Sequence, residues 1–231
     1  MNALLKYPGY LIAAGRQKNS LQKILTAHMA QAYARFRQSW NQLLPDLYLR
    51  DGGHYRLRRY SVFLWEKAKL KPLPYEPHYQ SSHYNKLHGG FKRHFRPWQA
   101  TTIHNPVLSA IIRWSIEQFS HDPAQAWRIQ AHQFRIRTSV HEEGKPTPEG
   151  IHKDGADYIL IMLLDRHNIE GGVSQVYDNE RRPLAEVTLQ ATGDLLLVND
   201  AQVYHGVTPV KPKNSAEAAW RDVLVLTFHR Q

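Results

Sequence analysis

The chain has 231 residues, 42% of them hydrophobic, with 30 Lys and Arg against 20 Asp and Glu. This composition predicts one soluble globular domain, and the net charge of +10 would attract nucleic acid, anionic lipid or a small anion. The absence of cysteine excludes disulfides and thiolate metal sites, so any metal must use His, Asp or Glu.

The first 15 residues do not form a signal peptide, because Lys6, Pro8 and Gly9 interrupt the apolar run. No run of about 18 apolar residues occurs anywhere, so no membrane span is predicted. We therefore expect a cytoplasmic protein.

Two helices are predicted in the first half. The first covers about residues 19–44, with Ser20 as its N-cap and His28 on its apolar face, where we expect a buried core histidine. The second begins at Asn105 and Pro106, because Asn is a good N-cap and Pro suits the first helical position, and it ends near His121. Its buried stripe is expected to contain Leu108, Ile111, Ile112, Ser115, Ile116 and Phe119.

A turn at 51–53 precedes a predicted strand at 55–66. Residues 71–98 lack periodicity and are rich in Pro, His and Tyr, which indicates a long ordered loop that could close over a site. Its histidines, His78, His83, His88 and His94, have no carboxylate at ligand spacing.

Basic and aromatic residues alternate before residue 100. This pattern favours a solvated face over an aromatic core, while a single-strand nucleic-acid binder remains the alternative. The basic members are Arg56, Arg58, Arg59, Lys67, Lys69, Lys71, Lys86, Lys92, Arg93 and Arg96.

Strand signals dominate the second half. Residues 127–137 alternate, which puts Gln133, Arg135 and Arg137 on one face that either lines a pocket or is solvated. Further strands are expected at 157–164, 172–178, 184–190, 194–199, 203–210 and 221–229, with a hairpin turn at 179–183 and a loop at 211–220. No helix pattern separates them, so the second half is an antiparallel sandwich or barrel.

A His-x-Asp pair lies just before the apolar strand at 157–164. On an extended backbone, His152 and Asp154 project to the same side. His205 precedes a glycine at the start of another strand, and it could complete a set of two imidazoles and one carboxylate, the ligand set of non-heme Fe(II) oxygenases. His141 and Glu143 have the same spacing, but they lie in a Gly- and Pro-rich segment that we expect to be a solvated loop.

Arg221 opens the last predicted strand, and Thr227 lies on the same alternating face. A guanidinium that faces a core needs a carboxylate partner, and its planar fork suits a bidentate one. We therefore interpret Arg221 as the residue that binds a dicarboxylate.

Four blocks of the second half, in order, carry a family resemblance. They contain Pro148–Gly155, Asn168–Ser174, His205–Pro209 and Arg221–Phe228. This order resembles the Fe(II)/2-oxoglutarate-dependent dioxygenases, and more narrowly the bacterial family that includes L-isoleucine 4-hydroxylase.

The resemblance implies a mainly β fold with a double-stranded β-helix (jelly-roll, cupin-like) core braced by N-terminal helices. It implies one domain over 1–231, with a helical and loop part at 1–125 and the core at 126–231. It also implies Fe(II) on His152, Asp154 and His205, 2-oxoglutarate on Arg221 and Thr227, and O2 as co-substrate.

By the same resemblance, the enzyme hydroxylates a small molecule, a free aliphatic amino acid. Such a substrate needs a cation for its carboxylate and an anion for its ammonium, and the candidates are Arg135, Arg137, Glu149 and Asp157. Three alternatives stay open: a nucleic-acid-modifying dioxygenase, a zinc hydrolase on the same ligands, and a non-enzymatic β-barrel binding module.

Overall fold

The computed structural model describes residues 2–15, 20–84, 87 and 89–231, so the predictions that concern Asn19, Lys86 and His88 fall outside the described residues. The helices are α1 (Ala3–Lys6), α2 (Ser20–Ala27), α3 (Ala30–Gln38), the 3-10 helix η1 (Ser39–Gln42), α4 (Ala100–Ile103) and α5 (Pro106–Phe119). None of the described helices is long and apolar enough to cross a membrane.

The strands are β1 (Tyr10–Ala13), β2 (Leu44–Pro45), β3 (Arg56–Glu66), β4 (Lys69–Pro72), β5 (Trp127–Thr138), β6 (Tyr158–His167), β7 (Ile169–Gly171), β8 (Val173–Tyr177), β9 (Pro183–Thr188), β10 (Leu195–Asn199), β11 (Tyr204–Val207), β12 (Val210–Pro212) and β13 (Ala219–Arg230). They form a main sheet in the order β1-β10-β6-β13-β5-β3-β2, with β4 added on β3, a small sheet in the order β11-β8-β9, and a β12-β7 pair. All of the strand pairs between these elements are antiparallel.

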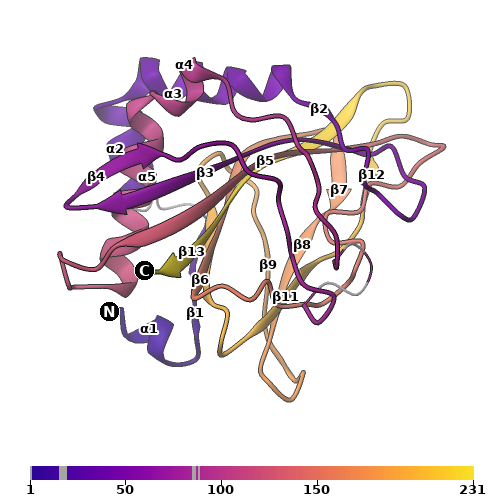
Figure 1. Cartoon of the computed structure of the whole chain (residues 1–231). Coiled ribbons are helices and arrows are strands. Elements are labelled where there is room, and N and C mark those ends of the chain that lie inside the picture. Colours follow the sequence, from indigo (N-terminus) through magenta and orange to yellow (C-terminus); the bar gives the residue numbers. More distant parts are fainter. Residues whose placement is uncertain (1, 16–19, 85–86, 88) are drawn as a thin grey trace.

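The main sheet is covered on both faces (Figure 1). Helices α2, α3 and α5 lie on one face, and the small sheet lies on the other. This arrangement of two facing antiparallel sheets is a double-stranded β-helix braced by helices, as the family resemblance implied. The strands β1 and β3 come from the N-terminal part of the chain, yet they pair within the main sheet with β10 and β5.

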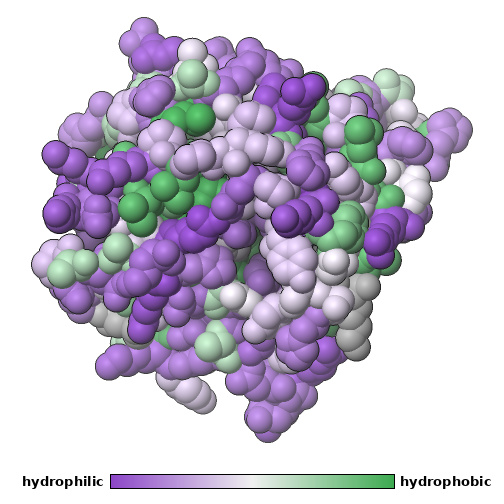
Figure 2. Space-filling view, viewed as in Figure 1, coloured by the Kyte–Doolittle hydropathy of each residue, from purple (hydrophilic) through white to green (hydrophobic). Residues whose placement is uncertain are grey.

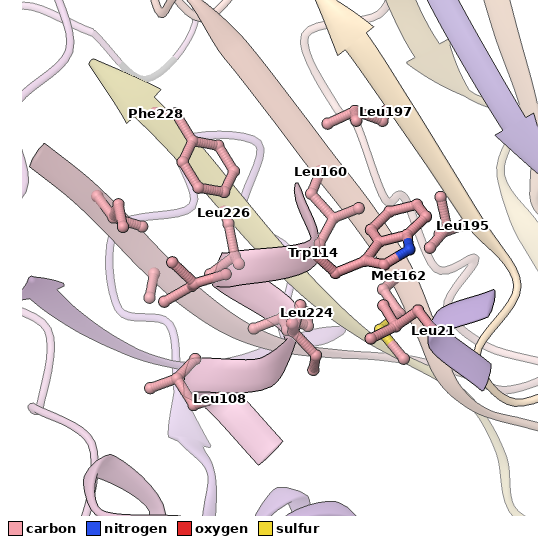
Figure 3. Close-up of a cluster of buried hydrophobic side chains, with 14 of the residues drawn as sticks. Leu21, Leu108, Trp114, Leu160, Met162, Leu195, Leu197, Leu224, Leu226 and Phe228 are labelled. Carbon is pink, nitrogen blue, oxygen red and sulfur yellow. The ribbon is translucent and has the colours of Figure 1, made fainter. Parts of the chain in front are cut away.

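Each face of the main sheet has its own apolar core, because successive residues of a strand point to opposite sides. Along β6, Leu160, Met162 and Leu164 pack toward the helices, whereas Ile159 and Ile161 pack toward the small sheet. Figure 3 shows the helix side, where Leu108 and Trp114 of α5 meet side chains from β6, β10 and β13. A strand buried on both sides explains the uninterrupted apolar run in the sequence.

The second predicted helix is confirmed. Asn105 caps α5, since its side chain accepts a hydrogen bond from the Val107 backbone N–H at 3.0 Å, and Pro106 is the first helical residue. All six residues of the predicted stripe are buried.

The first predicted helix is wrong in its continuity. It is two helices, because α2 ends at Ala27 and α3 begins at Ala30, and His28 in the break is exposed rather than part of the core. Ser20 is the first residue of α2, and its hydroxyl accepts a hydrogen bond from Trp114 Nε1 at 2.8 Å.

The predicted strand at 203–210 is also two strands, β11 and β12. Pro209 separates them, since proline has no N–H to donate to a ladder. The short strands β1, β2 and β7 were not predicted, because two to four residues give too little periodicity to detect.

Candidate active site

His152, Asp154 and His205 converge at the inner face of the double-stranded β-helix. One ligand atom from each side chain can be chosen so that all three lie within 4.8 Å of one another. The Asp154 carboxylate lies 3.6 Å from His152 Nε2 and 3.5 Å from His205 Nε2. Two imidazoles and one carboxylate at these separations fit a divalent metal ion with open coordination positions.

Backbone pairing fixes the two histidines. His152 and His205 exchange both backbone N–H···O bonds, at 2.9 and 3.0 Å, so the loop before β6 is held against β11. The His152 Nδ1–H donates to the Gly150 carbonyl at 3.0 Å, which turns Nε2 toward Asp154. A second hydrogen bond of this kind orients the ring of a metal ligand.

Two other residues hold Asp154. Its Oδ1 accepts a hydrogen bond from Gln80 Nε2 at 3.0 Å. The buried Asp200 carboxylate accepts from the backbone N–H groups of Asp154, Gly155 and Ala156, the shortest at 2.7 Å. The aspartate of the triad is therefore positioned by groups that lie far from it in the sequence.

The electrostatics of the triad favour a bound cation. Burial lowers the pKa of His152, but Glu149 and Asp154 together raise it to about 10. Burial and the charge on His152 lower the pKa of His205 to about 4. Burial raises the pKa of Asp154, but His152 and His205 outweigh burial and hold this pKa well below its usual range. The surrounding carboxylates stabilise a positive charge at this point. A bound metal ion would supply that charge in place of a proton.

The triad lies in a cavity of about 290 Å³ that is lined by the main sheet, the small sheet, residues 78–84 and Arg93. This volume is near the lower end of the ~300–1,000 Å³ common for ligand sites. Part of the predicted loop 71–98 forms a wall, since Tyr79, Gln80 and Tyr84 line the cavity. His78 lies in the same wall and is buried, whereas His83 and His94 are exposed.

Arg221 and Thr227 lie on one face of β13 and both line the cavity. Arg221 is only 1% exposed, and its Nε and Nη2 have no hydrogen-bond partner among the residues that the structure describes. The Thr227 hydroxyl also has none. Burial, with the nearby Arg166, lowers the pKa of Arg221 to about 10. A buried guanidinium without a partner fits an acidic ligand.

The four candidate substrate residues are not brought together. Glu149 lines the cavity, with its Oε1 3.6 Å from His152 Nε2. Asp157 lies outside the lining and accepts from the Arg230 backbone N–H. Arg137 is exposed and donates to the His54 carbonyl.

Arg135 also lies outside the cavity, on the helix side of the sheet. Its Nε and Nη2 donate to the two carboxylate oxygens of Asp222 at 2.7 and 2.6 Å. Of the two alternatives for the polar face of β5, pocket lining is therefore excluded, and the cavity is lined by the alternate residues His132, Phe134 and Ile136.

Sequence reasoning missed a basic group in the cavity. Arg56, Arg58 and Arg93 line it and are buried, so the basic region before residue 100 is not one solvated face. The signal was present, since Arg56 and Arg58 alternate along one predicted strand, but composition does not say which face is inward. The rival residue His141 is exposed, as expected for a solvated loop.

Residues 37–227 match the model of the 2OG-Fe dioxygenase family. Over 156 residues the chain is 28% identical to L-isoleucine-4-hydroxylase of Bacillus thuringiensis, a match that covers 65% of this chain and 64% of that protein. The chain thus spans slightly less than two thirds of that relative. It is also 24% identical to 3(1)-hydroxy-L-isoleucine 4-dioxygenase of Pantoea ananatis, over 71% of this chain and 68% of that protein.

Two solved structures are similar over almost the whole chain. A crystal structure of a bsmA homolog from Methylobium petroleophilum PM1 has a TM-score of 0.83 and 33% identity, and covers 97% of this chain and 90% of that chain. The structure of IDO from Bacillus thuringiensis has a TM-score of 0.78 at 18% identity, covering 99% and 93%, which shows a shared fold.

Proposed function

The chain belongs to the 2OG-Fe dioxygenase family, and from this premise we propose that it hydroxylates a C–H bond of a free aliphatic amino acid or a close derivative. The family uses Fe(II), 2-oxoglutarate and O2. The observation that carries the proposal is the content of one cavity, where three ligand atoms within 4.8 Å share the enclosed space with an unpartnered Arg221.

In this proposal His152, Asp154 and His205 hold the iron. A ligand set of this kind leaves adjacent coordination positions open for the 2-oxo acid and O2. Arg221 binds the distal carboxylate of 2-oxoglutarate through its fork, and the Thr227 hydroxyl donates to the same carboxylate. Both groups are buried without a partner in the described part of the chain, as this role requires.

The bound iron supplies the oxidising chemistry, which no protein side chain provides. The protein's own contribution is to position the metal ligands and the substrate and to exclude water. Gln80, Asp200 and the Gly150 carbonyl orient the ligands. Ile161, Val223 and Val225 give the cavity an apolar floor that suits an aliphatic chain.

The names of the two relatives support an amino-acid substrate, since one is an L-isoleucine hydroxylase and the other a 3(1)-hydroxy-L-isoleucine dioxygenase. A nucleic-acid substrate has less support, because Arg56, Arg58 and Arg93 of the basic region are enclosed in the cavity rather than displayed on the surface.

The test requires no substrate. Under anaerobic conditions, Fe(II) and 2-oxoglutarate are added to the metal-free protein, and the visible charge-transfer band of the chelate is recorded. We expect the band in the wild type and in His141→Ala, a control at an exposed histidine. His152→Ala should abolish the band, and Arg221→Gln should weaken 2-oxoglutarate binding about 100-fold, as for a lost buried charge pair. A wild type that binds iron without forming the band contradicts the proposal.

A further inference from the structure

A second group of buried cations lines the same cavity. Arg56 and Arg58 lie on β3 and point to its inner face, and Arg93 follows on the segment that pairs with His78. Their exposed fractions are 6%, 3% and 2%. Arginine is almost never buried to this degree unless it is paired.

One carboxylate serves two of these three guanidiniums. The buried Asp46 lies 2.7 Å from Arg56 Nε and 3.5 Å from Arg58 Nη1. Throughout residues 2–15, 20–84, 87 and 89–231, no carboxylate forms an ion pair with Arg93, and its Nε and Nη2 have no hydrogen-bond partner. Arg58 Nε lacks a partner as well. Within the described part of the chain, the three guanidiniums therefore have one carboxylate at ion-pair distance.

The carboxylates of Glu149 and Asp154 also interact with Arg93, but neither lies at ion-pair distance from it. The groups in direct contact with Arg58 are neutral or aromatic. Arg58 donates to His132 Nδ1 at 2.7 Å, so that ring nitrogen is an acceptor. Burial and the surrounding arginines keep the pKa values of His132 and His78 well below the usual range, so neither imidazole adds a charge. The Arg58 guanidinium lies 3.6 Å from the centre of the Phe95 ring. An aromatic face attracts a cation, but it accepts no hydrogen bond from the N–H groups that lack a partner.

Another arginine of the chain shows which partner satisfies the hydrogen-bond donors of a guanidinium. Arg135 donates through Nε and Nη2 to both oxygens of Asp222. Among the residues that the structure describes, the same two nitrogens lack partners in Arg93 and in Arg221. Two guanidiniums of the described cavity lining, Arg221 on β13 and Arg93, thus lack both of these bonds. Under the proposed function, 2-oxoglutarate completes Arg221 only.

We propose that Arg93, assisted by Arg58, binds a carboxylate of the primary substrate, which is therefore an α-amino acid or its N-acyl derivative rather than an uncharged compound. This inference rests on the proposed function, which assigns the other guanidinium to the co-substrate. Phe134 and Ile136 line the same cavity as the cations and the triad, and the Phe134 ring centre lies 4.5 Å from the Arg58 guanidinium. The carboxylate is held by the cluster, and the aliphatic part of the substrate extends toward the metal.

The test uses a panel of free L-amino acids and their N-acetyl derivatives, each beside its carboxamide. Binding to the protein loaded with Co(II) and 2-oxoglutarate is measured by thermal shift and calorimetry, which need no turnover. We expect some acids to bind the wild type and their amides to bind about 100-fold more weakly, as for a lost buried charge pair. Arg93→Gln should weaken acid binding by a similar factor and leave amide binding unchanged.

The matched control is Arg137→Gln, which removes an exposed arginine of β5 outside the cavity and should bind acids as the wild type does. Arg93→Gln should keep the charge-transfer band with 2-oxoglutarate, and its unfolding temperature should rise, because an unpartnered buried charge is removed. A lower unfolding temperature together with loss of the band would show that Arg93 is structural.

Three further results overturn the inference: equal binding of acids and amides, unchanged acid binding by Arg93→Gln, or no acid bound by a wild type that forms the band. A wild type that forms no band rejects the proposed function instead, and the comparison of acids with amides still decides the carboxylate site.

Discussion

Asp200 illustrates how much of this site depends on a residue that does not belong to the triad. It follows β10, is 2% exposed, and one of its oxygens accepts three consecutive backbone N–H groups, from Asp154 to Ala156. These bonds set the conformation of the loop that carries Asp154. Burial and the Asp154 carboxylate raise the pKa of Asp200 to about 6, although the backbone N–H groups oppose this.

Asp200→Ala removes the acceptor of these three N–H groups. We expect the affinity for Fe(II) or Co(II) to fall roughly 10–100-fold, as for other residues that orient metal ligands. Isothermal titration calorimetry with the metal ion measures this affinity. Asp178→Ala is the control, since Asp178 also accepts backbone N–H groups, in the hairpin turn before β9. Equal metal affinity in the wild type and Asp200→Ala would show that the loop holds its conformation without Asp200.

His152 and Asp154 were predictable because they are two positions apart beside a strong strand signal. His205 and Arg221 were predictable because each begins a strand segment of its own and has a side chain suited to the site. Asp200, Gln80 and Arg93 were not predictable as parts of the site, since each reaches it through tertiary contacts across more than 40 residues of sequence. An aspartate after a strand or an arginine in a loop has no periodic signature.

At the scale of elements, the sequence also does not reveal which face of a strand points toward the cavity. The alternation along β5 was correct, but alternation does not reveal which side of a sheet holds the helices. Gln133 bonds Ser39 of η1 and Arg135 bonds Asp222 on the helix side, which leaves His132 and Phe134 for the cavity. The prediction that Arg221 lies on the inward face of β13 was correct, because it came from the need of a buried guanidinium for a carboxylate and not from alternation.

The junction between β2 and β3 depends on a charge pair. Asp46 follows β2 and accepts from Arg56 Nε, while its own backbone N–H donates to the Arg56 carbonyl at 2.9 Å. Burial raises the pKa of Asp46, but Arg56 and Arg58 outweigh it and lower the pKa below its ordinary value. A carboxyl with a lowered pKa stabilises the fold above its unfolded pKa and loses this contribution as the pH falls through its folded pKa.

Asp46→Asn removes the ionised partner of two buried guanidiniums, Arg56 and Arg58. We expect a loss of about 3–5 kcal/mol in the free energy of unfolding at pH 7. The difference from the wild type should stay constant down to about pH 4, near the unfolded pKa of Asp, and shrink below it. Urea unfolding from pH 7 to pH 3 measures it, with Asp122→Asn at an exposed turn as the control. A difference that does not depend on pH would exclude the ionised pair as its cause.

At the scale of the whole molecule, the basic residues behind the net charge of +10 lie in two environments, the surface and the cavity. Lys67, Lys69 and Lys71 are exposed, and the face in Figure 2 is mostly hydrophilic. Arg56, Arg58 and Arg93, from the same basic region of the sequence, are enclosed in the cavity. Composition cannot separate these groups, because a solvated lysine and an enclosed arginine add equally to the sum. The fold separates them by placing one face of β3, together with Arg93, against the site.

Because the site joins parts of the chain that are far apart, its ligands should stabilise the whole fold. The cavity is formed by β3, β5, β6, β11, β13, residues 78–84, Arg93 and the loop at 146–155. A ligand at about 100 times its Kd adds about 2.7 kcal/mol to the native state. In a domain of this size, that raises the unfolding temperature by about 5–10 °C.

We therefore expect Co(II), used because it resists oxidation, to raise the unfolding temperature of the metal-free protein by this amount, and 2-oxoglutarate to raise it again only when metal is present. Differential scanning calorimetry measures both steps. In Arg221→Gln the metal step should remain and the 2-oxoglutarate step should vanish, while Arg137→Gln should show both. If 2-oxoglutarate stabilises Arg221→Gln as much as the wild type, its carboxylate binds elsewhere, and the assignment of the two guanidiniums in the cavity must be exchanged.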